Sequence, residues 1–410
     1  MTENNSAIFI VPRSSSAWVG SEAIWITVAG WARASKKKFD NTIVITTDRV
    51  AKPNEVLDYP LGSNYIKKKI YRRRFKLLPK LFKVLFKDIL QYKSSKSSSN
   101  YQSFYTSFDD KPAFVWEQHD IFPGPGRKIA NKFKVPLITY VHAPQVWEAA
   151  KWGVHRPVWG DWIEKNIETR SLLQSDLIAC VSFEVENKLI QMGVPKEKIL
   201  VSPMAVDIDL FGAINRDEVL LSKLGLKGKK VLGWTGSFRK FHGLDILIEA
   251  FKNVLDKDSN IALLLVGDGG ERGNVEQIVK ELGIEQSVVF TGRKKFTEIP
   301  RYVGLFDVAI VSARSNEGFH YSPLKLREYM CAGVASMAPR AGEIPQVFDD
   351  GENILLYEAG NINSISATIK KLFHNRELRN NIAINGKRHI KKTGTWEVEL
   401  SKTLSKLKIL

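Results

Sequence analysis

A basic segment at the start of a predicted helix is the part of this sequence best suited to bind an anion. Residues 322–328 read SPLKLRE, in which Ser322 is expected to cap the helix and Pro323 to take its first position. A helix N-terminus carries a positive partial charge and normally favours acidic side chains, yet Lys325 and Arg327 lie near this one. Cations beside unpaired backbone N–H groups suit a bound phosphate, so we predict a phosphate or diphosphate site here.

A second candidate anion site is the glycine-rich stretch GWTGSFRKFHG at residues 233–243, between a predicted strand and a predicted helix. Glycines together with Arg239, Lys240 and His242 at the end of a strand could hold an anionic ligand. A tight turn with solvated charges is the alternative. Residues 266–270, VGDGG, lack the third glycine of a dinucleotide fingerprint and are expected to form only a turn. The acids of residues 207–209, DID, are read as solvated, and we predict no metal site.

The elements that position these loops follow a βα alternation, the pattern of parallel sheets covered by helices. In the first half we expect strands at 7–11, 42–46, 113–117, 135–141, 176–181 and 199–202, and helices at 21–34, 125–132, 161–173 and 184–192. A second series has strands at 231–235, 261–266, 288–291, 308–311 and 334–338, and helices at 244–255, 274–282, 296–303, 323–332 and 344–348. The polar stretch 207–228 is expected to join the two halves.

This alternation predicts an α/β protein of two doubly wound, Rossmann-like domains that face a cleft. The N-terminal domain is expected at residues 1–206, the C-terminal domain at 207–392 and a final amphipathic helix within 393–410. A chain of 410 residues is long enough for two domains. Cys180 and Cys331 lie in apolar surroundings, so we expect buried free thiols rather than a disulfide.

The net charge of +17 is concentrated in residues 65–96, where twelve Lys or Arg stand against the single acid Asp88. Pro79 is expected to open a helix there, with Leu and Phe along one face. Such a helix suits the surface of an anionic membrane. The alternative is a domain helix whose Leu and Phe stripe packs inward, and both descriptions can hold together. Nucleic acid is not expected as a partner, because no recognition motif accompanies the charge.

The sequence shows neither a signal peptide nor an apolar run of the ~18–20 residues that span a bilayer. A cytoplasmic protein is therefore expected. With the basic segment it would be peripheral on the cytoplasmic face of the membrane.

Three stretches resemble the family-4 glycosyltransferases, which have the GT-B fold. They are GWTGSFRKFHGLDILIEAF, FTGRKKFTEIPRYVGLFDVAIVSA and EGFHYSPLKLREYMCAGVASMAPRAGEIPQVFDDGENILLY. The resemblance is strongest over residues 231–357, is weaker in the N-terminal half, and covers most of the chain. It implies a C-terminal helix that returns to the N-terminal domain. It also implies a retaining transfer of sugar from a nucleotide-diphosphate donor to a hydroxyl of a lipid-linked or polysaccharide acceptor, without a metal or cofactor.

Two other functions remain open at this stage. One is a nucleotide-sugar epimerase of the same architecture, which needs no lipid acceptor. The other is a noncatalytic, membrane-associated subunit that binds the nucleotide sugar.

The resemblance assigns the diphosphate to the two anion loops. The backbone N–H groups of residues 321–324, apart from Pro323, would cradle it together with Lys325, while Arg239 and Lys240 would stabilise it as it leaves. The whole set of implied donor-binding residues is Gly20, Gly236, Lys240, His242, Gly292, Arg293, His320, Tyr321, Ser322, Pro323, Leu324 and Glu328. The implied catalytic residues are His142, Arg239 and Lys325.

Several of these positions have distinct implied roles. Glu328 would accept hydrogen bonds from the ribose hydroxyls, the turn at Gly292 and Arg293 would lie by the nucleobase, and Gly20 would allow the backbone close to the phosphates. His142 follows a strand where the family often places an active-site His or Asn.

The chain also departs from the family pattern. His320 replaces a usual glutamate, His242 replaces a usual lysine, and Ser237 replaces a frequent arginine. The identity of the donor sugar is therefore not predicted.

Overall fold

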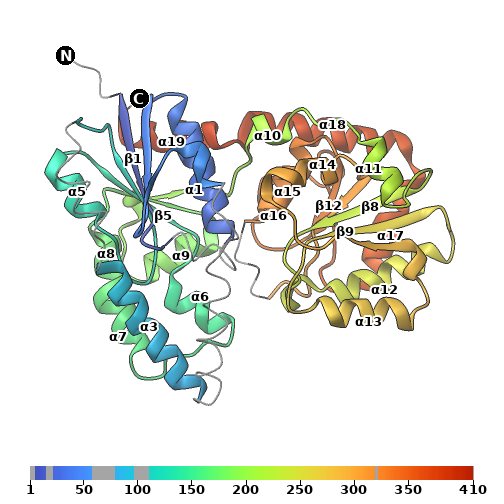
Figure 1. Ribbon diagram of the computed structural model, residues 1–410, viewed down its shortest axis with the longest axis horizontal. Coiled ribbons are helices and arrows are strands. Elements are labelled where there is room, and N and C mark those ends of the chain that lie inside the picture. Colours follow the sequence, from blue (N-terminus) through green and yellow to red (C-terminus); the bar gives the residue numbers. More distant parts are fainter. Residues whose placement is uncertain are drawn as a thin grey trace. The chain divides into compact units, whose positions relative to one another are not determined.

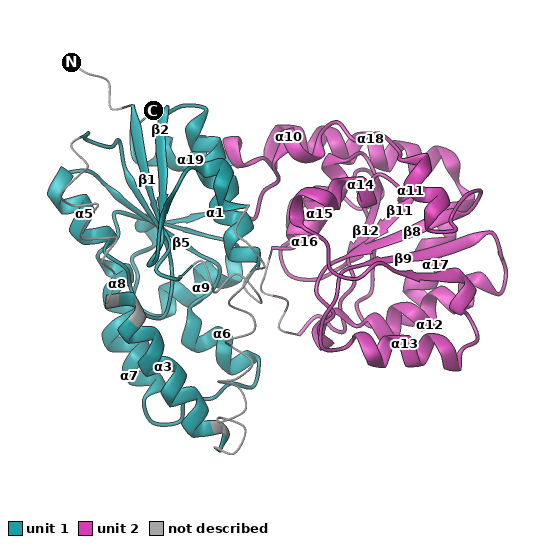
Figure 2. Cartoon of the chain, in the orientation of Figure 1, with its two compact units in different colours: residues 1–203, 399–410 teal, residues 204–398 magenta. Residues whose placement is uncertain are grey.

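The computed structural model describes residues 5–14, 22–57, 79–96, 110–317, 319 and 322–409. The chain divides into two compact units, shown in different colours in Figure 2. Unit 1 comprises residues 1–203 with 399–410, and unit 2 comprises residues 204–398. The last helix, α19 (Trp396–Lys406), starts in unit 2 and continues into unit 1. Its Glu399 accepts a hydrogen bond from Ser202 Oγ at 2.8 Å, so the C-terminal helix does return to the N-terminal unit.

Unit 1 is built on a seven-stranded sheet in the order β3-β2-β1-β4-β5-β6-β7, parallel except for β3. The strands are β1 (Ser6–Ile10), β2 (Asn41–Ile45), β3 (Val50–Ala51), β4 (Val115–Gln118), β5 (Leu137–Val141), β6 (Leu177–Cys180) and β7 (Ile199–Val201). The helices are α1 (Glu22–Lys36), α3 (Lys80–Lys96), α5 (Gly126–Phe133), α6 (Gln145–Lys151), α7 (Gly160–Ile163), α8 (Thr169–Leu173) and α9 (Phe183–Gln191). A π-helical stretch, Glu164–Glu168, joins α7 to α8.

Unit 2 holds a six-stranded, fully parallel sheet in the order β10-β9-β8-β11-β12-β13. Its strands are β8 (Lys230–Thr235), β9 (Ile261–Val266), β10 (Val288–Phe290), β11 (Val308–Ile310), β12 (Ala335–Pro339) and β13 (Leu355–Tyr357). Its helices are α10 (Ile208–Phe211), α11 (Glu218–Lys223), α12 (Leu244–Leu255), α13 (Arg272–Glu281), α14 (Ile299–Val303), α15 (Leu324–Cys331), α16 (Ile344–Val347), α17 (Ile362–His374) and α18 (Arg376–Thr393). Figure 1 shows helices on both faces of this sheet.

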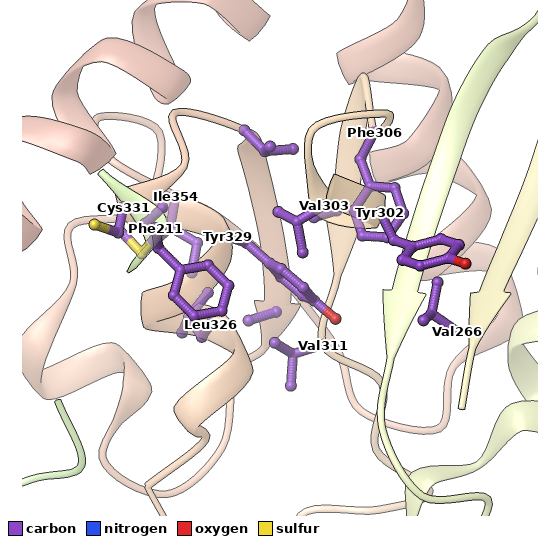
Figure 3. Packing of buried hydrophobic residues seen from close by; sticks show 14 of the residues in the cluster. Phe211, Val266, Tyr302, Val303, Phe306, Val311, Leu326, Tyr329, Cys331 and Ile354 are labelled. Atoms are coloured by element: carbon purple, nitrogen blue, oxygen red, sulfur yellow. The ribbon is translucent and has the colours of Figure 1, made fainter. Parts of the chain in front are cut away.

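The core of unit 2 consists of two clusters of buried apolar side chains. One cluster packs Phe211 and Tyr302 with Phe306 and Tyr329, as Figure 3 shows. Alternate residues of β8 supply the two clusters, so the sheet is buried on both faces, as expected for a doubly wound fold. A Cβ at Gly233 would lie 2.0 Å from the Phe306 ring, which leaves room only for glycine at this point of β8.

The predicted βα alternation is confirmed, but the polar stretch 207–228 is not a loose junction. It contains α10 and α11, and three of its apolar residues, Phe211, Leu221 and Leu226, are buried in the first cluster of unit 2. The prediction missed these helices because they have only four and six residues, which is too short to show a helical periodicity of apolar residues. Helices α6, α17 and α18 and strands β3 and β13 were not predicted either. The two thiols, Cys180 and Cys331, are free and buried as expected.

Helix α3 packs with its polar side inward, contrary to the inward-packing alternative for its Leu and Phe stripe. Asp88 and Ser95 are buried and Gln91 is partly buried, whereas the apolar side chains other than the partly buried Val84 are exposed. The exposed set is Leu81, Phe82, Leu85, Phe86, Ile89, Leu90 and Tyr92. Residues 65–78 of the predicted basic segment lie outside the described residues. Within the described chain, no helix is both long enough and apolar enough to cross a membrane.

Candidate functional site

The glycine-rich loop, residues 233–243, joins β8 to α12. Its Gly236 lies beside Lys325, which belongs to the other predicted anion site. Gly236, just after β8, has φ +145°, a conformation that favours glycine, and a Cβ there would lie 2.6 Å from Lys325 Nζ. Gly267, in the turn after β9, could not carry a Cβ either, because it would lie 1.8 Å from the Gly236 carbonyl oxygen. These glycines let the turns after β8 and β9 pack tightly beside the Lys325 ammonium. The VGDGG stretch is a strand-end turn, as predicted.

Tyr329 of α15 fixes the end of β8. Its hydroxyl accepts a hydrogen bond from the Thr235 backbone N–H at 2.7 Å and contacts Thr235 Oγ1 at 2.9 Å. The tyrosine is fully buried. The helix that carries Lys325 and Glu328 is thereby held against the loop that carries Gly236.

Lys325 is the most unusual group in this site. Its Nζ is buried and has no hydrogen-bond partner within the described part of the chain. It lies 4.1 Å from the centre of the Trp234 ring, a cation–π distance. Burial lowers the pKa of Lys325 to about 7, although the nearby Glu328 carboxylate favours the charged amine. A buried amine without a hydrogen-bond acceptor is poised to receive an anion.

Glu328 lies one turn further along α15 and is 4% exposed. Burial raises the pKa of Glu328 to about 8, and Lys325 opposes that rise. A carboxyl this deeply buried gains stability from a partner that donates hydrogen bonds. The hydroxyl pair of a ribose has the donors that such a carboxylate accepts.

His242 of the glycine-rich loop, residues 233–243, belongs to the same site. The ring is buried, packs edge-on at 5.5 Å from Trp234, and has no partner for Nδ1 among the described residues. Burial and the charges of Lys325 and Arg239 hold the pKa of His242 well below its usual range. Arg239 and Lys240 are exposed at the start of the same 3₁₀ turn, Lys240–His242.

Ser322 does not cap the helix, contrary to the prediction. Pro323 is the N-cap residue, with φ −75° and ψ 102°, and Leu324 is the first helical residue. Ser322 Oγ instead donates to Glu343 Oε1 at 2.5 Å and accepts from the Arg327 guanidinium at 2.8 Å and the Met204 N–H at 3.1 Å. Charge-assisted bonds to a buried ion pair outcompete a cap bond to a backbone N–H.

Arg327 is likewise not part of an anion site. It is 2% exposed, pairs with Glu343 Oε1 at 3.0 Å, and lies 5.5 Å from the Phe348 ring centre. Its charge is used inside the fold, in the network with Ser322 and Glu343. Of the two cations near the helix start, only Lys325 is left for a ligand.

Only some of the remaining predicted donor residues lie in the described part of the chain. Gly292 has φ +72° and accepts a hydrogen bond from Gly267 N at 3.1 Å, next to the exposed Arg293. This places the turn after β10 beside the turn after β9. Gly20, His320 and Tyr321 lie outside the described residues.

The predicted histidine of the other unit, His142, follows β5 and is partly buried. Its Nε2 lies 3.2 Å from Thr27 Oγ1, and that hydroxyl donates its own proton to the Ala23 carbonyl at 2.7 Å. Nε2 must therefore carry the proton, which leaves Nδ1 unprotonated. Burial lowers the pKa of His142 to about 4, so the ring is neutral near pH 7. Nδ1 can therefore accept a hydrogen bond.

His119, the second histidine at a strand end in this unit, has a structural role. It is 4% exposed, and its Nε2 contacts Glu168 Oε1 at 2.8 Å. Glu168 also accepts a hydrogen bond from the backbone N–H of Gln145 at the start of α6. Asp207 of the DID stretch has a structural role too, since it caps α10 by accepting from the Asp209 and Leu210 N–H groups.

Sequence reasoning missed Trp234 and Glu343. Trp234 supplies the ring against which Lys325 and His242 lie. A tryptophan near the end of a buried strand, two residues before Gly236, was the available signal. Glu343 was marked only by its place in the GEIP stretch. Its pairing with Arg327, sixteen positions earlier, has no periodicity that a sequence pattern could reveal.

Two models of protein families match parts of this chain. The model of the family described as "Glycosyl transferases group 1" matches residues 217–389, and that of "Glycosyltransferase Family 4" matches residues 100–210. The N-acetyl-alpha-D-glucosaminyl L-malate synthase of Bacillus anthracis is 28% identical over 219 residues, 53% of this chain and 55% of that protein. An uncharacterized glycosyltransferase of Methanocaldococcus jannaschii is 29% identical over 273 residues, 66% of this chain and 68% of that protein. Matches to such relatives thus span between about half and two thirds of their lengths.

Two solved structures share the fold over almost the entire chain. Anabaena HepE in complex with UDP has a TM-score of 0.65 at 18% identity and covers 99% of this chain and 100% of its own. Sucrose-phosphate synthase from Thermosynechococcus elongatus has a TM-score of 0.66 at 15% identity, and the match covers 98% of each chain. Both matches extend across the two units described above.

Proposed function

Because this chain belongs to the group 1 glycosyltransferases of family 4, with the GT-B fold, we propose that it moves a sugar from a nucleotide diphosphate to an acceptor hydroxyl with retention of configuration. The observation that carries this proposal is Lys325, whose buried Nζ lies over Trp234 without a hydrogen-bond acceptor among the described residues. A diphosphate supplies the missing negative charge.

We propose the following donor contacts in unit 2. Lys325 would bind the diphosphate, with Arg239 and Lys240 on the same side, and Glu328 would accept the ribose hydroxyls. Gly292 and Arg293 would lie by the nucleobase, and Gly236 and His242 would shape the loop around the phosphates. Solved structures of Anabaena HepE hold UDP and UDP-glucose, so a uridine nucleotide is the first donor to test.

The proposed chemistry needs positioning and charge rather than a nucleophile. In a same-face reaction the acceptor oxygen bonds to the anomeric carbon as the bond to the leaving phosphate oxygen breaks. That phosphate oxygen takes the acceptor proton. Lys325 stabilises the charge that develops on the leaving diphosphate, and removing such a group typically costs 10²–10³-fold in turnover. His142, neutral and with Nδ1 available, would orient the acceptor or the sugar through a hydrogen bond.

The proposed acceptor is a glycan or lipid-linked molecule at an anionic membrane. Helix α3 supports this, because it exposes seven large apolar side chains next to Lys83, Lys87 and Lys93. Amphipathic helices with a basic rim bind the interface of anionic bilayers. A peripheral position on the cytoplasmic face is proposed with it.

The donor proposal is tested by binding and turnover in purified variants. Uridine nucleotide sugars should raise the melting temperature of the wild type by mass action. Lys325→Met and Glu328→Gln should lose most of that rise and on the order of 10²-fold in donor turnover. Glu249→Ala, a change at an exposed acid of α12, serves as the matched control and should keep both. Full turnover in Lys325→Met and Glu328→Gln would contradict the assignment.

The same assay separates the alternatives. Transfer to an acceptor or slow donor hydrolysis supports a transferase, whereas interconversion of two nucleotide sugars indicates an epimerase. Binding with neither reaction indicates a noncatalytic subunit.

The membrane partner has its own test. The protein should pellet with vesicles that contain anionic lipid at low salt, and less so at high salt. The double variant Lys83→Glu, Lys87→Glu should weaken that binding strongly. Unchanged pelleting of the double variant would contradict a role for the basic side of α3.

A further inference from the structure

A second segment of unit 1 exposes large apolar side chains beside α3. It comprises residues 152–162, which link α6 to α7 and include the first turn of α7. Val158 is 84% exposed and Trp162 is 59% exposed, and Trp152 and Val154 are exposed as well. Aromatic and branched side chains are rarely left this exposed in one short loop unless another surface covers them.

Buried polar contacts join this segment to α3. The Asp88 carboxylate of α3 accepts hydrogen bonds from Arg156 Nε at 2.8 Å and Nη2 at 2.9 Å, and from Trp159 Nε1 at 2.9 Å. The Asp88 and Arg156 side chains are 4% and 10% exposed. A bidentate pair with a third donor has the geometry that compensates for burying a charge. The segment and the helix are therefore held together as one piece.

The same contacts determine which side chains face outward. Within the segment, Arg156 and Trp159 turn toward Asp88, while Val158 and Trp162 remain exposed. On α3, Asp88 and Gln91 face inward, and the Leu and Phe side chains stay outside. Gln91 Nε2 reaches Asp120 and adds a second anchor for the helix. The internal contacts are mixed, because Trp159 and Tyr92 also pack against an apolar cluster that includes Phe122. The other large apolar side chains of the two elements remain outside.

The charge of α3 indicates which kind of partner would cover this surface. Residues 79–96 carry five Lys and the single acid Asp88, whose charge is already paired with Arg156. A second copy of the chain would bring the same lysines against these, which like-charge repulsion disfavours. An anionic bilayer offers the opposite charge, and its interface accommodates Trp together with aliphatic side chains.

We propose that residues 152–162 and α3 form one bipartite membrane-contact surface, in which Val158 and Trp162 enter the interfacial region of an anionic bilayer and Asp88 holds the two parts together. This rests on the membrane partner proposed above and adds a second contact site, outside the basic segment. The lysines of α3 supply attraction to the lipid head groups, and the Trp and Val side chains supply apolar insertion.

A site-specific fluorescent probe tests the insertion. Both native cysteines are buried, so Val158→Cys can be labelled selectively with a dye whose emission shifts to the blue in apolar surroundings. Val219→Cys is the matched control, since Val219 is another exposed valine (65% exposed), on α11 of unit 2. Vesicles of phosphatidylglycerol and phosphatidylcholine should shift the emission at position 158 and leave that at 219 unchanged.

The outcomes distinguish this inference from the proposed function. Pelleting with vesicles without a shift at position 158 would overturn the bipartite surface and leave a contact through α3 alone. Failure to pellet would overturn both. A shift at position 158 on raising the protein concentration without lipid would show that a second copy covers the surface, and would also overturn the proposal.

A double variant supplies an independent readout. Val158→Ser with Trp162→Ser should weaken vesicle binding by at least about tenfold, because two exposed apolar side chains lose their burial in lipid. The melting-temperature rise on adding nucleotide sugar should stay at the wild-type value, since the changed residues lie in the other unit from Lys325. Wild-type vesicle binding by this double variant would contradict the proposal.

Discussion

Lys325 is the residue whose protonation is expected to govern donor binding. Burial lowers its pKa to about 7 in the free protein, so the amine becomes largely neutral as the pH rises above that value. A bound diphosphate favours the charged amine and raises the pKa, which means that binding takes up a proton above pH 7. The affinity for the nucleotide sugar should therefore fall with rising pH, by up to about tenfold per unit. Calorimetric titration between about pH 7 and pH 9 measures this slope.

Two variants show whether the slope belongs to Lys325. Lys325→Met should bind the donor weakly and without pH dependence in this range. Glu328→Gln removes the other group that titrates nearby, the carboxyl whose pKa burial raises to about 8. Between pH 7 and pH 8 this variant should show a steeper fall than the wild type, because ionisation of Glu328 no longer offsets the loss of charge on Lys325. A flat profile in Glu328→Gln would mean that the lysine is charged before the donor arrives.

Arg327 and Glu343 are predicted to matter for stability rather than for charge at the donor site. Arg327→Met leaves the buried Glu343 carboxylate without its guanidinium, a loss typically worth about 3–5 kcal/mol. Arg340→Met is the matched control, because Arg340 pairs with Asp350 at an exposed site where ion pairs contribute about 0–1 kcal/mol. Urea unfolding of both variants measures the difference. Equal losses would show that the Arg327 network is not needed for the fold.

At this scale the sequence predicted residue types better than residue partners. Lys325, Glu328 and Gly236 were predicted to belong to one site, and they lie close together in unit 2. Spacing along α15 and a strand-end glycine are local signals. The role of Ser322 as a cap was wrong, because a competing partner, Glu343, is brought in by the fold. Which of two neighbouring cations stays available for a ligand depends on buried partners, and those are absent from any local pattern.

Among the elements, α3 reverses the usual rule for amphipathic helices. Asp88→Ala should destabilise unit 1 by about 3 kcal/mol, because Arg156 is left buried without its partner. Phe82→Ser should change stability by no more than about 0.5 kcal/mol, since Phe82 is 57% exposed. Thermal unfolding of both variants tests this packing. A larger loss for Phe82→Ser than for Asp88→Ala would mean that the apolar side faces the core.

The periodicity of α3 predicted a two-sided helix but could not determine which side faces inward. Apolar spacing at Leu85 and Phe86 is the same for a core stripe and for a membrane stripe. The deciding feature is the buried ion pair with Arg156, sixty-eight positions away in the chain. Strands such as β8 and β9 were easier, because a fully buried parallel strand is apolar throughout.

At the scale of the whole molecule, the path of α19 leads to a prediction about the thermal stability of the two units. Residues 399–410 belong to unit 1, where Leu400 and Leu404 are fully buried and Glu399 accepts from Ser202. Deleting them removes at least two buried leucines, each typically worth about 2–5 kcal/mol, so unit 1 should unfold at a lower temperature. Unit 2 keeps both of its apolar clusters and should keep its own unfolding transition.

Nucleotide sugar should raise the temperature of the unit 2 transition by mass action in the truncated protein as in the intact one. Calorimetric scans with and without the ligand measure both transitions. If the deletion abolished the ligand-dependent transition as well, the donor site would depend on unit 1 for its folding.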